Sequence, residues 1–262
     1  GLAPGVYTLT EELQTDWISV SVPKPVTLAC KNATCQNFTN EKSHGPFWTV
    51  CKDGSCNFKI IQEAINAASP GDTIEVQSGT YEHVLVNKTL ILQGNDTGSG
   101  LPVVDAGGSG SAITLAADGC TLQGFNACNP SLFNSGIKVI SSKNTIIDNI
   151  ATVNSLSSPS NNAISGSPFD RKYGIYLESS RDNNISGNNV TGNDYGICLD
   201  SSRDNIISRN TATDNDCGIH LTSSSSDNTI SDNTATSNKW GIYLFSSSNN
   251  NITGNTATGN KR

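Results

Sequence analysis

Methionine is absent from this 262-residue chain, even at position 1, and charged residues make up only 15% of it. A start without Met indicates a processed N-terminus, as cleavage of a signal peptide would leave. The formal net charge of −7 is modest, so nothing in the charge balance favours nucleic acid or an anionic membrane as a partner. No apolar run approaches the roughly 18 residues of a membrane span. We expect a secreted chain without membrane insertion.

Cysteine, by contrast, is abundant, with eight residues. Four of them form two Cys-x4-Cys pairs. Zinc sites more often have two or three residues between cysteines, and no histidine pair accompanies these, so disulfides are favoured over metal. The cysteines expected in disulfides are Cys30, Cys35, Cys51 and Cys56, oxidised among themselves, and Cys120, paired with Cys128 or with that group.

Asn-x-Ser/Thr sequons are also frequent. A chain rich in Asn, Ser and Thr forms sequons by accident, so they are weak evidence alone. Together with the cysteines they favour an extracellular, glycosylated protein at the cell surface. The sequon asparagines are Asn32, Asn37, Asn87, Asn95, Asn184, Asn189 and Asn251.

A 22-residue repeat dominates the second half of the chain. Nearly the same line occurs four times, with one extra Ser in the third: YGIYLESSRDNNISGNNVTGND (173–194), YGICLDSSRDNIISRNTATDND (195–216), CGIHLTSSSSDNTISDNTATSNK (217–239) and WGIYLFSSSNNNITGNTATGNK (240–261). Apolar residues recur within each line with period two, which is typical of strands and not of helices. Asparagines recur in register between these short strands, where they suit tight corners and can bond the copies above and below.

The repeat predicts an all-β fold: a right-handed parallel β-helix of about eight or nine 22-residue coils over residues 57–262. An amphipathic stretch, Phe58–Ala68, is expected to be a short N-terminal capping helix. Residues 1–56 are expected to form a small disulfide-stapled, β-rich appendage. Residues 156–172 are expected to be a loop inserted between coils.

The chain resembles known families in two places. The stretch IIQEAINAASPGDTIEVQSGTYEHVLVNKTLILQG resembles the N-terminal cap and first coils of pectin-lyase-like β-helices. The later GIYL…NNISGNN lines resemble the NosD-type, carbohydrate-binding and sugar-hydrolase repeats of archaeal surface proteins. The resemblance covers about residues 57–262 and implies the fold strongly but the function weakly, because this scaffold hosts lyases, hydrolases, epimerases, adhesins and envelope proteins.

Two acids are the weak catalytic candidates. Glu178 and Asp200 occupy the same position in successive lines and would stack about 5 Å apart, the separation of a retaining glycosidase pair. Arg181 and Arg203 stack three residues further on, so the four charges can also simply neutralise one another on a solvated face. The signature motifs of polygalacturonase-like and pectate-lyase families are absent. We therefore expect no enzyme activity on acidic polysaccharides.

Metal and sugar binding have weaker support. Copper prefers Met, Cys or clustered His, but the histidines His44, His83 and His220 are far apart, so no cofactor is expected. His220 is expected to face outward between Cys198 and Tyr243. Calcium at the Asn-Asp corners stays open. Sugar binding would use exposed aromatic rings that stack on the sugar, and the candidates are Tyr176, Tyr243 and Trp240. Equally, Trp240 and Tyr195 can be buried at a corner of the coil.

The last line suggests assembly. It is the most aromatic, with Trp240, Tyr243 and Phe245, and its open strand edge is a template for another chain. Cys198 and Cys217 should lie too far apart to bond each other, so we expect them to bond a neighbouring subunit.

These patterns predict a structural cell-surface protein, a disulfide-stabilised homopolymer that forms an archaeal envelope layer, sheath or filament. Its partners would be other copies of itself and envelope polysaccharide. The alternative is a polysaccharide-binding or polysaccharide-active β-helix, that is, a lyase, hydrolase or epimerase.

Overall fold

The computed structural model describes residues 5–8, 17–19, 25–28, 40–42, 47–107, 110–128, 134–152 and 172–262. The chain forms two compact units, Gly1–Gly45 and Pro46–Arg262. In the first unit, two antiparallel pairs are described: β1 (Gly5–Thr8) with β3 (Pro25–Leu28), and β2 (Trp17–Ser19) with β4 (Asn40–Lys42). Several predicted features lie outside the described residues: Cys30, Cys35, His44, the sequons at Asn32 and Asn37, and residues 156–171 of the insertion.

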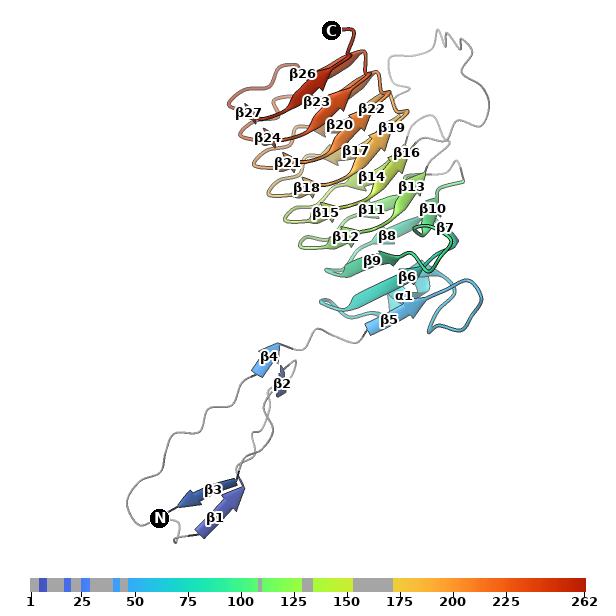
Figure 1. The fold of residues 1–262 in the computed structure, drawn as a ribbon, viewed down its shortest axis with the longest axis vertical. Helices are drawn as coiled ribbons and strands as arrows, with labels where there is room; N and C mark the ends of the chain where they lie inside the picture. Colours follow the sequence, from blue (N-terminus) through green and yellow to red (C-terminus); the bar gives the residue numbers. More distant parts are fainter. Residues whose placement is uncertain are drawn as a thin grey trace. The chain divides into compact units, whose positions relative to one another are not determined.

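The second unit is a parallel β-helix in which successive coils stack into three sheets (Figure 1). The predicted right-handed parallel β-helix is confirmed. The nine-stranded sheet contains β5 (Phe47–Val50), β6 (Thr73–Gln77), β9 (Ile91–Asn95), β12 (Thr121–Gln123), β15 (Thr145–Ile147), β18 (Asn184–Ser186), β21 (Ile206–Ser208), β24 (Thr229–Ser231) and β27 (Asn251–Thr253).

The other two sheets run alongside it. The seven-stranded sheet contains β8 (Val84–Val86), β11 (Ile113–Leu115), β14 (Ser135–Val139), β17 (Tyr173–Glu178), β20 (Tyr195–Asp200), β23 (Cys217–Thr222) and β26 (Trp240–Leu244). The eight-stranded sheet contains β7 (Thr80–Glu82), β10 (Val103–Asp105), β13 (Asn126–Cys128), β16 (Ile150–Thr152), β19 (Asn189–Thr191), β22 (Thr211–Thr213), β25 (Thr234–Thr236) and β28 (Thr256–Thr258).

Period-two apolar residues form continuous columns inside the helix. Ile175, Ile197 and Ile219 are paired in register across adjacent strands and are fully buried, and Ile242 continues the column. The first Gly of each line lies on the inner side of a corner. A Cβ on Gly196 would come within 2.5 Å of the Gly218 carbonyl oxygen, so only glycine allows the coils to stack here. Burial of each Ile stabilises the fold by about 1.5–3 kcal/mol.

Asparagine ladders hold the corners together. Asn188 is buried and represents them: its Nδ2 donates to Asn210 Oδ1 at 2.9 Å and to the Ile146 carbonyl oxygen at 3.0 Å. Its own Oδ1 accepts from the backbone N–H of Asn149. Each ladder asparagine thus bonds the coil before it and the coil after it, which satisfies polar groups that water cannot reach.

A short helix caps the N-terminal end of the β-helix unit. The helix α1 (Ile61–Ala67) ends beneath the ammonium group of Lys88, which donates to the carbonyl oxygens of Ile65, Asn66 and Ala68. These are the carbonyls that a helix leaves without partners at its C-terminus, where a cation is also favoured by the helix dipole. The predicted capping helix is therefore present, with bounds slightly inside the predicted ones.

The boundary between the two units differs from the predicted one. β5 pairs in parallel with β6, and Cys51 forms a disulfide with Cys56 in the segment that follows β5. Residues 47–56, which the sequence pattern assigned to the appendage, are therefore part of the β-helix unit. Four residues are too few to show a strand pattern, so only pairing with β6 reveals β5.

Candidate functional site

The outward face of the seven-stranded sheet carries a continuous array of rings, called here the ring ladder. Its contacts are Tyr176–Tyr173 at 4.5 Å between ring centroids, Tyr173–Tyr195 at 5.5 Å, Tyr195–His220 at 4.9 Å, His220–Tyr243 at 5.3 Å and Tyr243–Trp240 at 4.9 Å. The residues come from positions 1 and 4 of successive lines, so the 22-residue period places them side by side. The ladder crosses four coils.

Most ring faces in this ladder are covered: the four inner rings each contact two others, and the end rings Tyr176 and Trp240 each contact one ring and one cation. The interplanar angle is 5° between His220 and Tyr243 and 21° between Tyr173 and Tyr176, so the rings stack face to face. Stacking on a sugar needs an open ring face. The arrangement therefore disfavours the sugar platform considered for Tyr176, Tyr243 and Trp240, which are all partly buried.

A cation lies at each end of the ring ladder. The Lys138 ammonium is 5.7 Å from the Tyr176 ring centroid, and the Arg262 guanidinium is 5.1 Å from that of Trp240. Burial, and then the nearby Asp200 carboxylate, raise the pKa of the Tyr176 phenol far above its ordinary value. The ladder is thus an array of stacked rings with a cation–π contact at each end, which stiffens the stacked coils.

The two candidate acids are in register, and each also contacts another side chain. Glu178 and Asp200 are direct partners between β17 and β20. Glu178 forms an ion pair with Lys138 at 2.8 Å, and Asp200 accepts a hydrogen bond from the Tyr176 hydroxyl at 3.3 Å. Each acid is engaged with a ring-ladder neighbour.

The two arginines do not neutralise these acids. Arg181 and Arg203 lie side by side, and each is 3.9 Å from the aspartate that follows it, Asp182 and Asp204. The expected four-charge cluster is therefore wrong, because a corner turns the arginines away from β17 and β20. Exposed pairs at this distance contribute little stability.

Cys198 and His220 lie on adjacent coils and are both buried, with 2% and 5% of their surface exposed. The Cys198 Sγ is 3.7 Å from His220 Nδ1. Both were expected to face solvent, which is wrong. His220 is enclosed by the rings of Tyr195 and Tyr243, at 4.9 Å and 5.3 Å between centroids, and its own imidazole lies against Cys198.

The other thiols are also inside the molecule. Cys217 is 3% exposed, and burial, with a contribution from Asp216, raises its thiol pKa to about 12. Buried Cys198 and Cys217 are badly placed for the expected disulfide to a neighbouring subunit. Cys120 and Cys128 are free thiols, so their predicted pairing is wrong. Cys120 precedes β12 and Cys128 ends β13, and a corner places these strands in different sheets.

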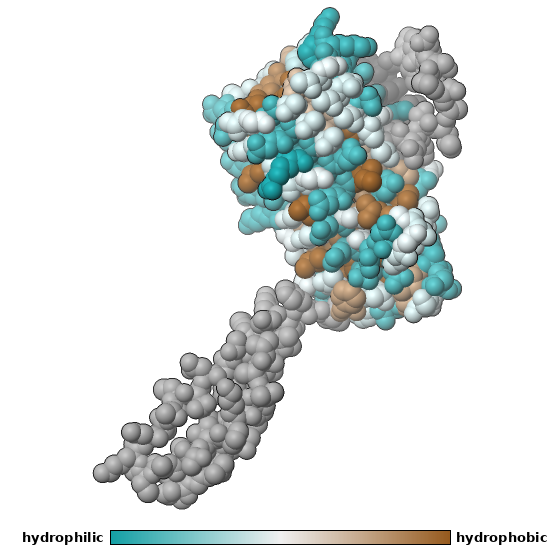
Figure 2. Space-filling view, in the orientation of Figure 1, coloured by the Kyte–Doolittle hydropathy of each residue, from teal (hydrophilic) through white to brown (hydrophobic). Residues whose placement is uncertain are grey.

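The three aromatic residues of the last line, which were predicted to be exposed, differ in their accessibility. Phe245 is 56% exposed, whereas Trp240 and Tyr243 are partly buried in the ring ladder. The face shown in Figure 2 is mostly hydrophilic, with separate hydrophobic spots and no continuous apolar patch. The sequon asparagines within the described residues are all exposed: Asn87, Asn95, Asn184, Asn189 and Asn251.

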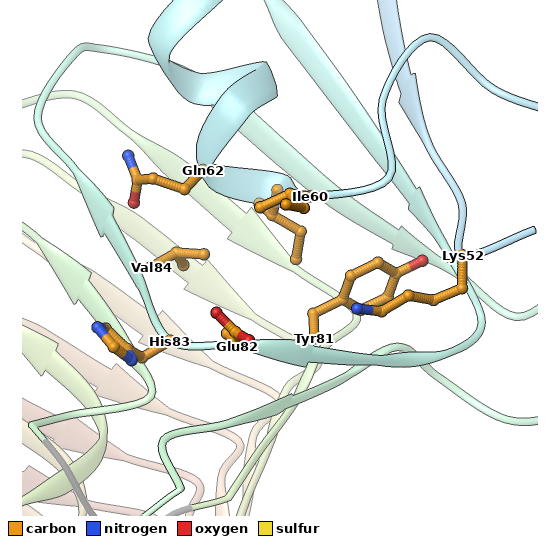
Figure 3. Close-up of a pocket in the computed structure, with 8 residues that line it drawn as sticks. Lys52, Ile60, Gln62, Tyr81, Glu82, His83 and Val84 are labelled. Atoms are coloured by element: carbon orange, nitrogen blue, oxygen red, sulfur yellow. The ribbon is translucent and has the colours of Figure 1, made fainter. Parts of the chain in front are cut away.

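A pocket of about 150 Å³ lies beside the capping helix (Figure 3). The Lys52 ammonium lies 4.7 Å from the Tyr81 ring centroid at one side of it. Gln62 lines it too, but bonds both the N–H and the carbonyl of Leu85. No sequence pattern marks the pocket, because its walls come from separate segments: Lys52, Ile60, Ile61, Gln62, Tyr81, Glu82, His83 and Val84.

Two kinds of feature are not found where the structure is described. No helix there is long and apolar enough to cross a membrane. Nor do the described residues contain a group of three or more His, Cys, Asp or Glu side chains that could hold a metal ion.

Solved structures with a similar chain path include two pectin methylesterases and a pectate lyase, all with low scores. A pectin methylesterase from carrot is 16% identical, with 84% of this chain and 85% of that chain covered and a TM-score of 0.44. The pectate lyase Pel9A is 13% identical (75% and 70% covered, TM-score 0.38). The pectin methylesterase from Aspergillus niger is 12% identical (82% and 86% covered, TM-score 0.31). Scores this low support no argument about activity.

Curated proteins give no match. A family model does match: it is described as "Periplasmic copper-binding protein (NosD)" and covers residues 65–262, well over half of the chain. The matched region begins within α1 and includes the coils from β6 to β28. This chain belongs to the NosD family of parallel β-helix proteins.

Proposed function

We propose that this chain is a structural subunit of a cell envelope that assembles head to tail into a layer, sheath or filament. The observation that carries the proposal is the nine-stranded sheet. It runs through the whole β-helix unit, with β5 as its first strand and β27 as its last. Among the described residues, β27 has no strand on its outer side, whereas the outer edge of β5 is already bridged by Phe58 at Val50. All strands of this sheet are parallel, so the open edge of β27 can take a strand of a second copy with the same polarity, and the Phe58 segment that covers β5 faces the contact at the other end.

Side chains at the two ends of this sheet are complementary. Trp48 of β5 pairs with Ile74 and begins the inward column that Ile252 of β27 ends. Ile252 is 43% exposed, whereas Ile230 in the coil before it is fully buried. Trp48 packs against the Phe58 ring at 5.6 Å between centroids, so a second copy would cover Ile252 with this aromatic pair and bury apolar surface on both sides.

At the capped end, the edge of the seven-stranded sheet is strand β8, and its polar groups are already hydrogen-bonded. Gln62 of α1 accepts from the Leu85 N–H and donates to its carbonyl, which occupies the polar edge of β8. β5 is covered in the same way by residues 57–58, so the open strand edge that directs assembly is β27. A head-to-tail contact does not close on itself unless its rotation permits, so it generates polymers.

The proposed setting is the outside of an archaeal-type cell. Exposed sequons on the sides of the helix would carry glycans without blocking the inward columns at its ends. The Cys51–Cys56 disulfide next to β5 is consistent with an oxidising compartment and stiffens the contacting end.

Assembly can be tested with two exposed isoleucines of the same sheet. Ile252→Lys places a charge on the open edge, whereas Ile206→Lys places it on the outward face of β21, where the side chain is 48% exposed. We expect the wild-type protein and Ile206→Lys to polymerise in sedimentation and electron microscopy, and Ile252→Lys to stay monomeric. A wild-type monomer at high concentration under oxidising conditions contradicts the proposal, as does polymerisation of Ile252→Lys.

A polysaccharide-active protein is the second candidate, and the Glu178–Asp200 register favours it. Because both acids are engaged with other groups, we expect no lyase or hydrolase turnover on acidic polysaccharides. Product assays by reducing-sugar release and by absorbance of unsaturated products test this. Turnover that disappears in Glu178→Gln or Asp200→Asn would favour the second candidate.

Copper is named in the family description, and the described residues offer it a limited set of donors. The thiol of Cys198 and the imidazole of His220 are soft enough and close enough to act together. Copper bound there would add a strong link between two coils. The donor pair therefore fits copper chemically, as a two-donor site.

A further inference from the structure

The pocket beside the capping helix has an apolar floor. Its buried lining residues are Ile61 of α1, Tyr81 of β7 and Val84 of β8, each at most 3% exposed. Ile60, which is 44% exposed, adds an apolar wall on the open side. A cavity of about 150 Å³ can hold a molecule of the size of benzene. The floor is therefore suited to a short aliphatic group and is too small for a large ring system.

The rim of the same pocket carries two opposite charges. Lys52 and Glu82 both line it and are both exposed. In Figure 3 the Lys52 side chain extends along the Tyr81 ring toward the side of the pocket where Glu82 lies. The ion pairs of the described residues include neither of them. Their hydrogen-bonding groups therefore remain available to a ligand.

The rim and the floor are held in place before any ligand arrives. Lys52 belongs to the short loop that the Cys51–Cys56 disulfide closes, and its ammonium lies 4.7 Å from the Tyr81 ring centroid. The Tyr81 hydroxyl donates to the Gln77 carbonyl oxygen at 2.9 Å, which fixes the ring. Side chains that are already ordered lose little freedom when a ligand binds, so this pocket is preformed.

We propose that this pocket binds a small aliphatic α-amino acid in its zwitterionic form. The ligand carboxylate accepts hydrogen bonds from the Lys52 ammonium, and the ligand ammonium donates to the Glu82 carboxylate. Both are charge-assisted hydrogen bonds, which are the stronger class. The aliphatic side chain lies on the floor beside Ile60 and Val84, where it loses contact with water. A plain anion would face Glu82 and a plain cation would face Lys52, so only a ligand with both charges satisfies the rim.

The inference goes beyond the proposed envelope role and does not rest on it. The pocket is built from residues 52–84, whereas Ile252 lies in the last strand of the nine-stranded sheet. All titrations are therefore run on the Ile252→Lys variant as well as on the wild type. Binding by this variant, together with a wild-type protein that fails to polymerise, overturns the assembly proposal alone. Polymerisation of the wild type, together with a variant that does not bind, overturns the pocket proposal alone.

A ligand series on the full chain, with its disulfide intact, is the first test. Isothermal titration calorimetry compares leucine with isocaproate, which lacks the ammonium group, with isoamylamine, which lacks the carboxylate, and with tryptophan, whose side chain exceeds the floor. We expect leucine to bind at one site and each of the other three to bind at least about tenfold more weakly.

Charge-neutral variants of the rim are the second test. Lys52→Gln should weaken leucine binding at least about tenfold and leave isoamylamine unaffected, whereas Glu82→Gln should weaken leucine to a similar extent and leave isocaproate unaffected. The matched controls are Lys59→Gln and Glu75→Gln, which change charges that do not line the pocket and should bind leucine as the wild type does. Thermal unfolding checks that every variant is folded.

Four outcomes would overturn the proposal. They are the lack of saturable leucine binding, binding of isocaproate or isoamylamine as tight as that of leucine, equally tight binding of tryptophan, and a loss in a control variant equal to that in its rim counterpart. The second outcome would mean that a single charge suffices, and the third that the floor does not set the size of the ligand.

Discussion

The first and last coils of the β-helix share one core but close their corners differently. Cys120 and Phe125 occupy corner positions that are asparagines in the next coil, since their backbone N–H groups donate to Asn144 and Asn149. From there to the last coil, the corners are held by buried asparagine ladders. In the first coils a buried thiol and a buried ring fill the same places.

This difference separates two sources of stability. The apolar column of the nine-stranded sheet passes without a break from Leu122 to Ile146, Ile185 and Ile207. The asparagine ladders begin partway along it. The hydrophobic core is therefore sufficient to stack coils, and the ladders add directional hydrogen bonds that hold the corners of successive coils in register.

Breaking a ladder should have the largest effect. Asn188→Leu removes the acceptor of Asn149 and leaves the Ile146 carbonyl without its donor, both in the interior. We expect a loss of about 4 kcal/mol in the free energy of unfolding. Denaturant unfolding measures it, with the exposed neighbour Asn189→Ala as control, for which we expect less than about 0.5 kcal/mol. Equal effects of the two changes would contradict the role of the ladder.

Core truncation should affect both regions alike. Leu122→Ala in the first coils and Ile207→Ala in the repeats lie in one column and are fully buried. We expect each to cost about 3 kcal/mol, from lost burial and the cavity left behind. The comparison is made by denaturant unfolding under identical conditions. A much smaller effect of Ile207→Ala would mean that the ladders, and not the core, carry the repeats.

The capped end should depend on one ammonium group. Lys88→Met keeps the aliphatic stem but leaves the carbonyls of Ile65, Asn66 and Ala68 without their shared donor. We expect a loss of about 2 kcal/mol. Hydrogen exchange should quicken in α1 and remain unchanged in β20 to β28. Faster exchange in the repeats would show that the cap and the repeats unfold together.

Alkaline pH should weaken the repeats through Cys217. Its pKa is raised from an ordinary 9.0 to about 12 when the chain is folded. The contribution of the thiol to the free energy of unfolding is therefore fully present below pH 9. It is lost between pH 9 and 12, by up to about 1.4 kcal/mol per pH unit, because the unfolded chain then releases the proton more readily than the folded one. Cys217→Val should flatten the fall in stability with pH over that range, as followed by thermal unfolding. An unchanged slope would show that the thiol does not titrate in this way.

The amino-acid sequence by itself determined the coil. A 22-residue line with inward Ile and Leu at period two can bury its apolar side only by stacking on its copies, and this predicts a solenoid. The corner asparagines followed from the same register. Prediction succeeded there because each coil repeats one local pattern, so a single correct assignment applies to all of them.

Tertiary packing alone decided the site. Position 4 of each line points outward, which predicted exposure for Cys198 and His220. Tyr195 leans across to His220 on the next coil and encloses it together with Tyr243, while the His220 imidazole lies 3.7 Å from the buried Cys198 sulfur. The sequence gives the direction in which a side chain leaves the backbone, but not how large neighbours fold over a small one. For the same reason β5 and the separation of Cys120 from Cys128 emerged only from strand pairing, which joins residues that no local pattern connects.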